Sequence, residues 1–320
     1  MRSLEWRTVS TETPVDLLRC PSCHSELTFS AGALICAEGT RFPVVRGIPR
    51  LVSEASLDEE RTRTADAFGY SWSHYPKKNP YTEEQWRDWV VPLTPDDFAG
   101  KKVLDVGCGL GGFAEYARSW GAACVVGVDL SSAIDAARER LGDGVELVQG
   151  DIYAMPLADG GFDLAYSIGV LHHLSDPERG FRAMVRTVRP GGLVFAWVYG
   201  REGNGLIVRV VDPLRRRVLS RLPHGFLKWA ISLPLAAILW PFVRAAARGA
   251  SFPYAAYFRF LAQNDFRFTH GVVFDHLVAP TSHYVRRDEF AGWFERAGLV
   301  DVQITRRNEN SWRGLGRVPG

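Results

Sequence analysis

The ten residues VLDVGCGLGG, at positions 103–112, decide the fold class of this 320-residue chain. An apolar run ends in closely spaced glycines and leads into a helix-forming segment, as happens where a buried strand turns into a helix. Gly107, Gly109 and Gly112 match the GxGxxG pattern of dinucleotide-binding loops, a match that is weak by itself. Asp105 disfavours a pyrophosphate, because a carboxylate at the entrance of the loop would repel it. The same carboxylate suits a cationic ligand.

Around this loop, short apolar runs alternate with helical segments. The alternation predicts an α/β fold, a Rossmann-like doubly wound and mostly parallel sheet with helices on both faces. Strands are expected at 102–106, 124–128, 145–149, 162–167, 192–199 and 299–305, with a weakly written seventh near 311–318. Helices are expected at 111–120, 131–141, 177–188 and 287–297.

Composition divides the chain into five segments. Residues 1–55 are expected to form a small β-rich, ribbon-like module, and 56–100 a linker with N-terminal helices that cover the ligand site. The sheet core occupies 101–200, a helical, apolar and basic lid insertion follows at 201–273, and 274–320 return to the sheet.

The charges are unevenly distributed along the chain. The net charge is +2, so nothing global argues for nucleic acid or an anionic membrane. Residues 201–248 alone carry nine Lys/Arg against two acids. Their apolar stretch 229–243 contains Pro234 and Pro241 and is shorter than the ~18–20 residues of a spanning helix, which predicts a buried or interfacial helix pair.

The cysteines and the N-terminus bear on the compartment. Five cysteines form no disulfide-like framework, and the first residues lack the apolar stretch of a signal peptide. Both features predict a cytoplasmic protein in a reducing compartment. The basic, apolar insertion leaves peripheral membrane association through the lid open as an alternative.

Two further acids follow later predicted strands. Asp129 ends the second strand, 24 residues beyond Asp105, where an acid can bind both hydroxyls of a ribose. Asp151 ends the third strand, where its carboxylate can accept a hydrogen bond from an adenine amino group. Three acids at the carboxyl ends of one parallel sheet converge on its ligand crevice. The alternative is that Asp129 and Asp151 only cap the helices that follow them.

The order of these motifs resembles that of the class I S-adenosylmethionine-dependent methyltransferases. The resemblance covers about 101–200, with a weaker return at 283–306. It is specific for the fold and the cofactor, and it says little about the methyl acceptor. The motifs are the Asp105 loop, Gly127-Val-Asp129, Gly150-Asp151-Ile with Met155-Pro156, Phe162-Asp163, Val170-Leu-His-His173 and Arg189-Pro-Gly-Gly192.

The resemblance implies a set of residues that bind S-adenosylmethionine. The glycine loop shapes the methionine part, Asp129 binds the ribose, Asp151 and Ile152 flank the adenine, and 167–169 form the floor near the sulfonium. Two aromatics ahead of the core are expected to close over the cofactor, or else to pack a helix on the sheet. The implied residues are Asp105, Gly107, Gly109, Gly111, Asp129, Leu130, Asp151, Ile152, Ser167, Ile168, Tyr70 and Trp72.

Methyl transfer needs alignment of the acceptor and exclusion of water, and a hydroxyl or amine acceptor also needs a base. His172 and His173 follow the fourth strand beside the expected methyl position. His283 and the Asp275-His276 pair lie where the insertion rejoins the sheet. The catalytic candidates are His172, His173 and His283, with a hydrogen-bonding role in neighbouring loops as the alternative for each.

The expected function is methylation of a small-molecule or lipid-like acceptor on O, N or C, in secondary metabolite, quinone, lipid or glycan biosynthesis. An RNA methyltransferase is the first alternative and a catalytically inactive cofactor-binding scaffold the second. DNA is not an expected partner. RNA is disfavoured because the basic residues concentrate in the insertion and form no face on the N-terminal module.

The N-terminal cysteines resemble part of a zinc-ribbon-like module that activates tRNA methyltransferases. Cys20, Cys23 and Cys36 would supply three ligands, but Gly39 and Thr40 stand where the fourth is expected. His24 directly follows a presumed ligand, which makes a tetrahedron difficult to close. The sequence therefore favours a degenerate, metal-free ribbon over bound zinc.

Overall fold

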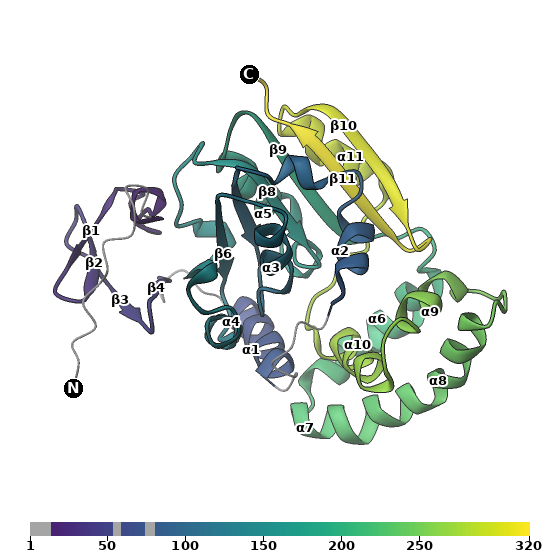
Figure 1. The fold of residues 1–320 in the computed structure, drawn as a ribbon. Helices are drawn as coiled ribbons and strands as arrows, with labels where there is room; N and C mark the ends of the chain where they lie inside the picture. Colours follow the sequence, from purple (N-terminus) through teal and green to yellow (C-terminus); the bar gives the residue numbers. More distant parts are fainter. Residues whose placement is uncertain (1–13, 54–58, 74–80) are drawn as a thin grey trace.

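The computed structural model describes residues 14–53, 59–73 and 81–320. One continuous sheet runs through it, in the strand order β1-β2-β3-β4-β7-β6-β5-β8-β9-β11-β10 (Figure 1). Neighbours from β4 to β9 pair in parallel, and β11 pairs antiparallel with both β9 and β10. The doubly wound, Rossmann-like α/β prediction is confirmed.

The predicted core elements agree with the structure to within a few residues, except that β9 starts at Val188. The seventh strand, for which the sequence signal was weak, is present as β11. The core strands are β5 (Lys102–Val106), β6 (Cys124–Asp129), β7 (Glu146–Gly150), β8 (Phe162–Ile168), β9 (Val188–Tyr199), β10 (Val300–Arg307) and β11 (Ser311–Arg317). The core helices are α3 (Gly112–Ser119), α4 (Ala133–Leu141), α5 (Pro177–Arg186) and α11 (Arg287–Arg296).

Helices cover both faces of this sheet. Phe181 of α5 and Phe290 and Phe294 of α11 are fully buried on one face. On the other face Trp86 of α2 (Glu83–Val90) packs with buried alanines of α3 and α4. Local signals set the helix starts: Thr82 and Gln85 form a capping box at α2, and Asp176 accepts from the Arg179 amide ahead of Pro177 at α5.

The N-terminal module joins the main sheet. Its strands are β1 (Leu27–Ser30), β2 (Ala33–Cys36), β3 (Arg41–Val45) and β4 (Ile48–Leu51), after a 3-10 turn at Pro14–Leu17. β4 pairs in parallel with β7, and the Arg50 guanidinium donates to both carboxylate oxygens of Asp135 (2.6 and 3.3 Å) and to Gln149 Oε1 (3.2 Å). The module therefore closes the edge of β7, which sequence analysis did not predict.

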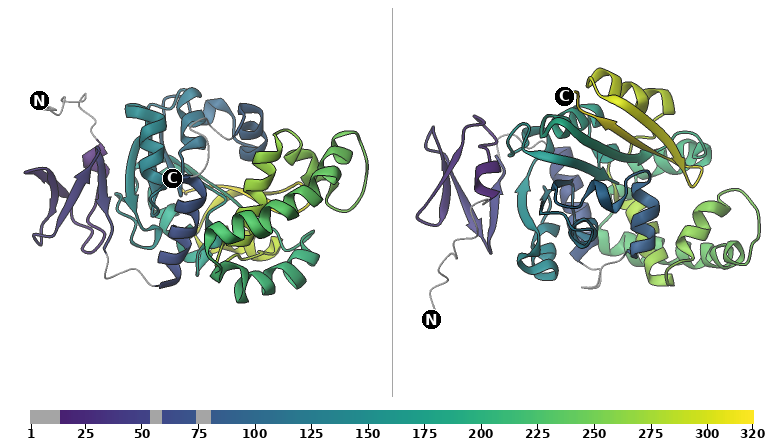
Figure 2. Two further views of the ribbon diagram at one scale, coloured as in Figure 1. Left: turned by 90° about the horizontal axis from the view of Figure 1, so that it is seen from below. Right: turned by 45° about the horizontal axis from the view of Figure 1, so that its top comes forward.

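The predicted linker segment at 56–100 lies partly outside the described residues. From Glu59 the chain forms α1 (Glu59–Ser73), which packs on α4 and on α10 (Phe266–Val278) of the lid. The aromatic run 68–72 is thus helical. The module and the lid lie at opposite ends of the molecule (Figures 1 and 2).

The prediction of a helix pair in the lid is wrong. Residues 224–247 form one helix of 24 residues that is long and apolar enough to cross a membrane, by length and composition only. It comprises α7 (His224–Phe226), a π-helical segment at Leu227–Ser232 and α8 (Leu233–Ala247). The wide π turns lie directly ahead of Pro234, and Pro241 is accommodated inside α8, so neither proline ends the helix.

The rest of the lid surrounds this helix. A π-helical segment at Ile207–Val211 continues into α6 (Asp212–Arg217), followed by 3-10 turns, and α9 (Ala255–Leu261) packs on α8. Leu227, Ala236 and Val243 form the fully buried face of the long helix. Within the lid, α8 therefore packs on α9 and α10, and α10 in turn packs on α1.

The Arg50 contacts predict how firmly the module is held. Arg50→Ala should lower the free energy of unfolding by about 1–2 kcal/mol, because it removes a largely buried bidentate pair that joins the module to α4. Arg46→Ala is the matched control: its pair with Glu139 is exposed on both sides and should contribute about 0–0.5 kcal/mol. Urea unfolding of both variants makes the comparison, and equal losses would contradict it.

Candidate functional site

The glycine loop between β5 and α3 requires glycine at its first position. Gly107 has a φ of +78°, and a Cβ there would lie 2.4 Å from a methyl of Val170. Gly109 and Gly111 also have positive φ, and the Gly109 amide donates to Asp129 Oδ2 (2.8 Å). The loop backbone is therefore pressed between the ends of β6 and β8 at the carboxyl edge of the sheet, where α/β folds bind ligands.

Asp129 and Asp151 both face the cavity, and both also cap their own loops. Asp129 Oδ1 accepts from the amide (2.8 Å) and hydroxyl (2.6 Å) of Ser131, and Asp151 Oδ1 accepts from the Tyr153 amide (2.9 Å). Burial raises the pKa of Asp129, and the bonds from Ser131 and Gly109 oppose that rise. Capping and ligand binding, the two sequence-based alternatives, are compatible at both positions.

Asp105 lies behind the loop, 2% exposed and outside the cavity wall. Its Oδ2 has no hydrogen-bond partner among the described residues. Burial raises the pKa of Asp105 to about 8, with the Asp129 charge adding to the rise and the neighbouring Tyr166 hydroxyl and Ala114 amide opposing it. A buried carboxyl with one unsatisfied oxygen beside a ligand cavity indicates a position that is set by function.

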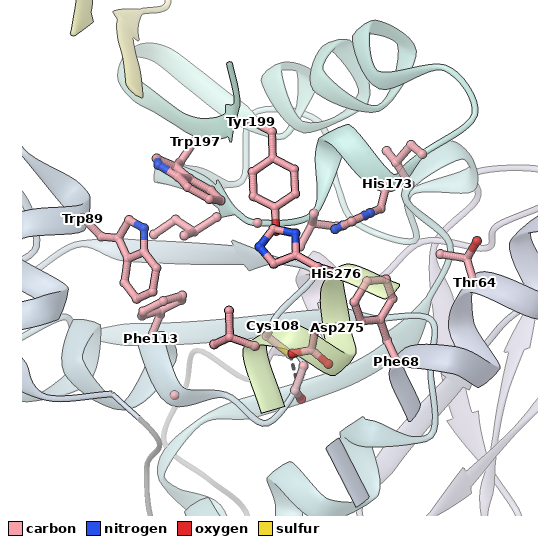
Figure 3. A pocket seen from close by; sticks show the side chains of 18 of the residues that line it. Thr64, Phe68, Trp89, Cys108, Phe113, His173, Trp197, Tyr199, Asp275 and His276 are labelled. Carbon is pink, nitrogen blue, oxygen red and sulfur yellow. Dashed lines mark hydrogen bonds between the residues drawn. The ribbon is translucent and has the colours of Figure 1, made fainter. Parts of the chain in front are cut away.

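One cavity of about 280 Å³ opens at this edge (Figure 3). Its first half is formed by the loop, Asp129, Leu130, Asp151, Ile152 and Ile168. Its second half is aromatic and comes from α1, α2, β9 and the lid. The aromatic and heteroaromatic members are Phe68, Tyr81, Trp89, Phe113, His173, Trp197, Tyr199, Tyr254, Tyr257, Phe260, Phe268, His276 and Tyr284.

Only one of the three predicted catalytic histidines lines the cavity. His173 lines the cavity, with Nδ1 2.8 Å from the Thr281 carbonyl oxygen and 3.0 Å from Ser282 Oγ. Burial lowers the pKa of His173 to about 3, although the Thr281 hydrogen bond opposes the shift. His173 is therefore neutral at pH 7 and held by one nitrogen.

His172 and His283 lie outside this cavity. His172 is fully buried behind the wall, its ring 3.9 Å from that of Tyr199, and neither nitrogen has a hydrogen-bond partner among the described residues. Burial lowers the pKa of His172 well below the usual range, so it packs as a neutral ring. His283 lines a separate surface hollow with Arg216 and Glu289.

His276, on α10, occupies the position that these candidates were expected to fill. Figure 3 shows its ring in the centre of the cavity, beside Tyr199 and above Asp275. Its Nε2 lies 3.1 Å from the Tyr257 hydroxyl, and its ring stacks on Tyr199 at 5.3 Å. Burial lowers the pKa of His276 to about 4, with the nearby Arg215 charge adding to the shift.

Four other predicted cofactor residues lie outside the cavity wall or have a side chain that the structure does not describe. Gly111 ends the loop beside α3, and the Ser167 hydroxyl donates to the Val106 carbonyl (2.9 Å); neither lines the cavity. Tyr70 packs outside it on His224 and Phe274. Trp72 is part of α1, but its side chain lies outside the described residues. α1 contributes Thr64, Ala65 and Phe68 to the wall.

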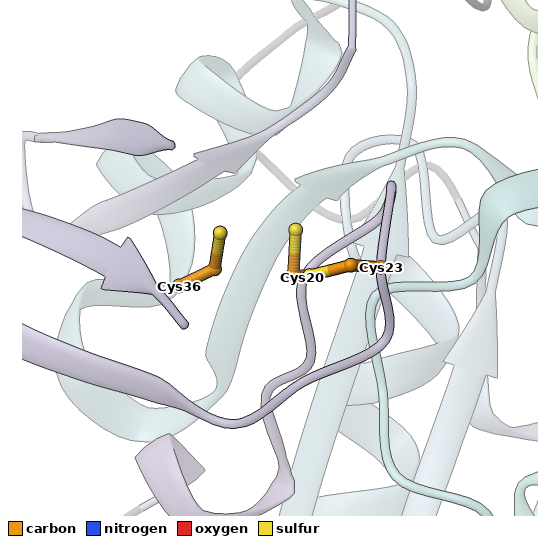
Figure 4. A group of neighbouring side chains, drawn as sticks. All are labelled: Cys20, Cys23 and Cys36. Atoms are coloured by element: carbon orange, nitrogen blue, oxygen red, sulfur yellow. The ribbon is translucent and has the colours of Figure 1, made fainter. Parts of the chain in front are cut away.

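The three N-terminal cysteines gather at the far end of the sheet (Figure 4). Their Sγ atoms lie within 4.8 Å of one another, and no fourth Cys, His, Asp or Glu joins the group within the described parts of the chain. The side chain of His24 is 41% exposed, and its Nε2 lies 3.5 Å from Asp159 Oδ1. The cluster is compatible with a zinc-ribbon-like module, but it does not supply the closed four-ligand site of a structural zinc.

Comparison with known proteins bears on the core segment. Residues 104–196 match the family model described as a methyltransferase domain. Over 147 residues the chain is 40% identical to the ubiquinone biosynthesis O-methyltransferase of Thiobacillus denitrificans, which covers 44% of this chain and 60% of that one. Its counterpart from Pseudomonas putida is 36% identical over 145 residues, covering 44% and 59%.

The chain is thus similar to methyltransferases over its core segment, residues 104–196. It matches about three-fifths of the length of these curated relatives. A chain from the complex between the Haloferax volcanii Trm112 methyltransferase activator and a putative methyltransferase is structurally similar at a TM-score of 0.46 and 15% identity, covering 79% of this chain and 98% of that one.

The residues of the methyltransferase site fit S-adenosylmethionine. The ligand carries a positive sulfur and an ammonium group, and the cavity contains three acids, Asp129, Asp151 and Asp275. Gly107 and Gly109 allow a close approach of the backbone. At pH 7 the buried Asp105 behind the loop is mostly protonated in the free protein, and it would add a negative charge once a cationic ligand lowers its pKa.

Asp105 should lower the stability of the folded protein and strengthen its binding of the cofactor. The folded protein holds the proton of Asp105 up to a pKa of about 8, whereas an unfolded Asp loses it near 4, so the cost of a buried charge grows between these values and is full above pH 8. Asp105→Asn should therefore raise the melting temperature at pH 9 by roughly 2–4 °C per kcal/mol gained and raise it markedly less at pH 5. Thermal melts at both pH values test this.

The same variant should bind the cofactor product S-adenosylhomocysteine about tenfold more weakly, since the carboxylate can no longer balance the ammonium group. Titration calorimetry measures the affinity. Asp163→Asn, at a capping acid remote from the cavity that accepts from the Lys102 amide, serves as the control. Unchanged affinity in Asp105→Asn would show that Asp105 is a packing residue.

Proposed function

We propose that this protein is an S-adenosylmethionine-dependent O-methyltransferase of a small aromatic hydroxyl acceptor of the kind used in quinone biosynthesis. The observation that carries the proposal is the single cavity in which a glycine loop with acids meets an aromatic wall with a neutral histidine. The curated relatives are named as O-methyltransferases of ubiquinone biosynthesis, which supports the same class of acceptor.

The first half of the cavity would hold the cofactor. Gly107 and Gly109 would approach its methionine part, Asp129 its ribose, and Asp151 and Ile152 its adenine. When bound, the cofactor supplies a methyl group on a positively charged sulfur. Asp129 would then have to share its carboxylate between the ribose and the bonds it accepts from Gly109 and Ser131.

The second half suits a planar acceptor. Trp197, Tyr199 and Tyr257 present ring faces and edges to the cavity, and Phe260 and Phe268 add apolar surface. Stacked or edge-on contacts with such rings orient a flat molecule and exclude water, which is the main requirement of an in-line transfer. A hydroxyl on that ring would be held facing the cofactor half.

The Tyr257–His276 pair would accept the proton of the acceptor. A histidine with a pKa of about 4 is neutral at pH 7, so its Nε2 is free to receive a proton through the Tyr257 hydroxyl that lies 3.1 Å away. The acceptor oxygen would gain the methyl group while the cofactor sulfur keeps the electron pair of the broken C–S bond, and Tyr257 and His276 would take up the proton of the hydroxyl. Asp275, next on the same helix and also in the cavity wall, would stabilise the resulting imidazolium.

The RNA alternative has less support. Three arginines of the N-terminal module, Arg19, Arg46 and Arg50, are paired with Glu26, Glu139 and Asp135. Paired arginines form a poor track for a phosphate backbone. The scaffold alternative is disfavoured by the neutral His276 beside an aromatic cage.

The direct test incubates the full chain with methyl-labelled cofactor and, separately, catechol-type phenols, total RNA and boiled protein. Label should enter the phenol fraction, as a base-stable methyl ether identified by mass spectrometry. Label in RNA alone would sink the proposal in favour of the RNA alternative. Binding of the cofactor without label in either fraction would favour the scaffold.

His276→Gln should lower kcat by about 10²–10⁴, the usual contribution of a general base, with KM changed only a few fold. Tyr257→Phe should lower kcat in the same direction. His24→Gln, at an exposed histidine of the module, is the control and should match the wild type. Cofactor affinity should be equal in all three.

The pH profile separates a base from a packing residue. With its pKa at about 4, His276 stays in its base form from pH 8 down to pH 5, so kcat/KM should lack a fall near pH 6.5. A fall near pH 6.5 that disappears in His276→Gln would contradict the assigned pKa.

A further inference from the structure

The long lid helix, residues 224–247, is apolar on the side that faces away from the protein. Phe226, Trp229, Ile238 and Phe242 are each 51–64% exposed and Leu235 36%. Phe226 and Trp229 are three residues apart, and Leu235, Ile238 and Phe242 follow one another at intervals of three and four residues, as residues on one side of a helical turn do, whereas Leu227, Ala236 and Val243 are buried. Soluble proteins rarely leave such a continuous apolar row uncovered.

A second apolar row lies on the preceding segment of the lid. Leu206, Val210 and Leu214 follow one another at four-residue intervals over the π-helical segment and α6, and all three are at least half exposed. Ile207, on the same segment, lines the cavity. The lid therefore has one side in the cavity and apolar rows toward the outside.

The charges around these rows have one sign. Between residues 213 and 264 there are eight Lys/Arg and no Asp or Glu. Arg209, Arg217, Arg221, Arg244 and Arg248 are exposed, and none has an ion pair among the residues that the structure describes. Arg215 and Arg216 share the nearest acid, Asp212.

We propose that these lid rows dock the protein on the surface of an anionic phospholipid bilayer, with the 224–247 helix lying in the plane of the interface. Exposed Trp and Phe on one side of a helix and cations at its ends are the chemistry that headgroups and acyl chains recognise together. The helix does not span the bilayer, because its buried side is packed on α9 and α10. A second copy of the chain fits this face less well, since a twofold contact would bring the same arginines together.

Membrane docking goes beyond the proposed function and does not rest on it. It does bear on substrate delivery, since the segment that carries the outer row also lines the cavity through Ile207. A hydroxylated ring on a lipid tail would reach the cavity from the bilayer without crossing water.

Vesicle co-sedimentation of the full chain tests the proposal without any methyl transfer. Wild-type protein should sediment with vesicles that contain about a third phosphatidylglycerol and remain in the supernatant, at least tenfold less bound, with phosphatidylcholine alone. Ile238→Glu/Phe242→Glu should lose binding at least tenfold. Val300→Glu is the matched control: Val300 is 44% exposed on β10, away from the lid, and its variant should bind as the wild type does.

A charge variant separates the electrostatic contribution to vesicle binding from the apolar one. Arg244→Glu/Arg248→Glu should lose binding to the anionic vesicles, and high salt should weaken wild-type binding in the same way. Arg41→Glu, an exposed arginine of β3, is its control and should bind normally. Equal melting temperatures and equal binding of S-adenosylhomocysteine would show that all variants are folded.

Three outcomes overturn the proposal: wild-type protein that stays in the supernatant with both vesicles, equal losses in Val300→Glu and Ile238→Glu/Phe242→Glu, or a dimer in sedimentation velocity that Ile238→Glu/Phe242→Glu dissolves without vesicle binding. The last would assign the face to a second copy. Since none of these readouts involves catalysis, failure of docking and failure of the proposed methyl transfer are told apart.

Discussion

The Asp129 carboxylate ties together the two loops on which the site depends. One oxygen accepts from the Gly109 amide at the end of β5, and the other accepts twice from Ser131 at the end of β6. Val170, after β8, fills the space that any side chain at Gly107 would need. Three neighbouring strand ends are thereby locked in one arrangement. These contacts form the crevice without help from a ligand, so little conformational entropy of the loops is lost when a ligand binds.

The charges around this crevice are arranged at a cost to stability. Asp105 is buried without a partner on Oδ2, and His172, His173 and His276 are held neutral by burial. Neutral buried histidines weaken the fold as pH falls below 6.5, because the unfolded chain takes up the protons first. Asp105 weakens it as pH rises. Such opposed demands are typical of residues placed for binding or catalysis.

The sheet and the glycine loop could be predicted because their signals are local. Short apolar strand runs, the glycines at 107–111 and caps such as Asp176 each act within a few residues of themselves. The aromatic wall had no such signal. Trp197 and Tyr199 belong to a run that resembles any buried strand, and they meet Tyr257 and His276 only when the lid folds over β9.

The histidines show, within a single turn, that the sequence does not reveal which side chains meet in the folded protein. His172 and His173 are adjacent in a 3-10 turn, where consecutive side chains point in different directions, so one enters the cavity and the other the core. The sequence could name the pair but could not choose between them. The N-terminal cysteines are the converse case, since the spacing alone already showed that a fourth ligand is missing.

The lid helix was misjudged for a physical reason that also explains its two roles. Hydrophobic periodicity identifies a helix by contrast between a wet and a dry side, and residues 229–243 have no polar side to provide it. Leu227, Ala236 and Val243 are covered by protein, whereas Ile238 and Phe242 are not. Only the folded structure distinguishes these two apolar sides. Because the adjoining segment reaches the cavity through Ile207, whatever covers the outer side of the lid also bears on the cavity wall.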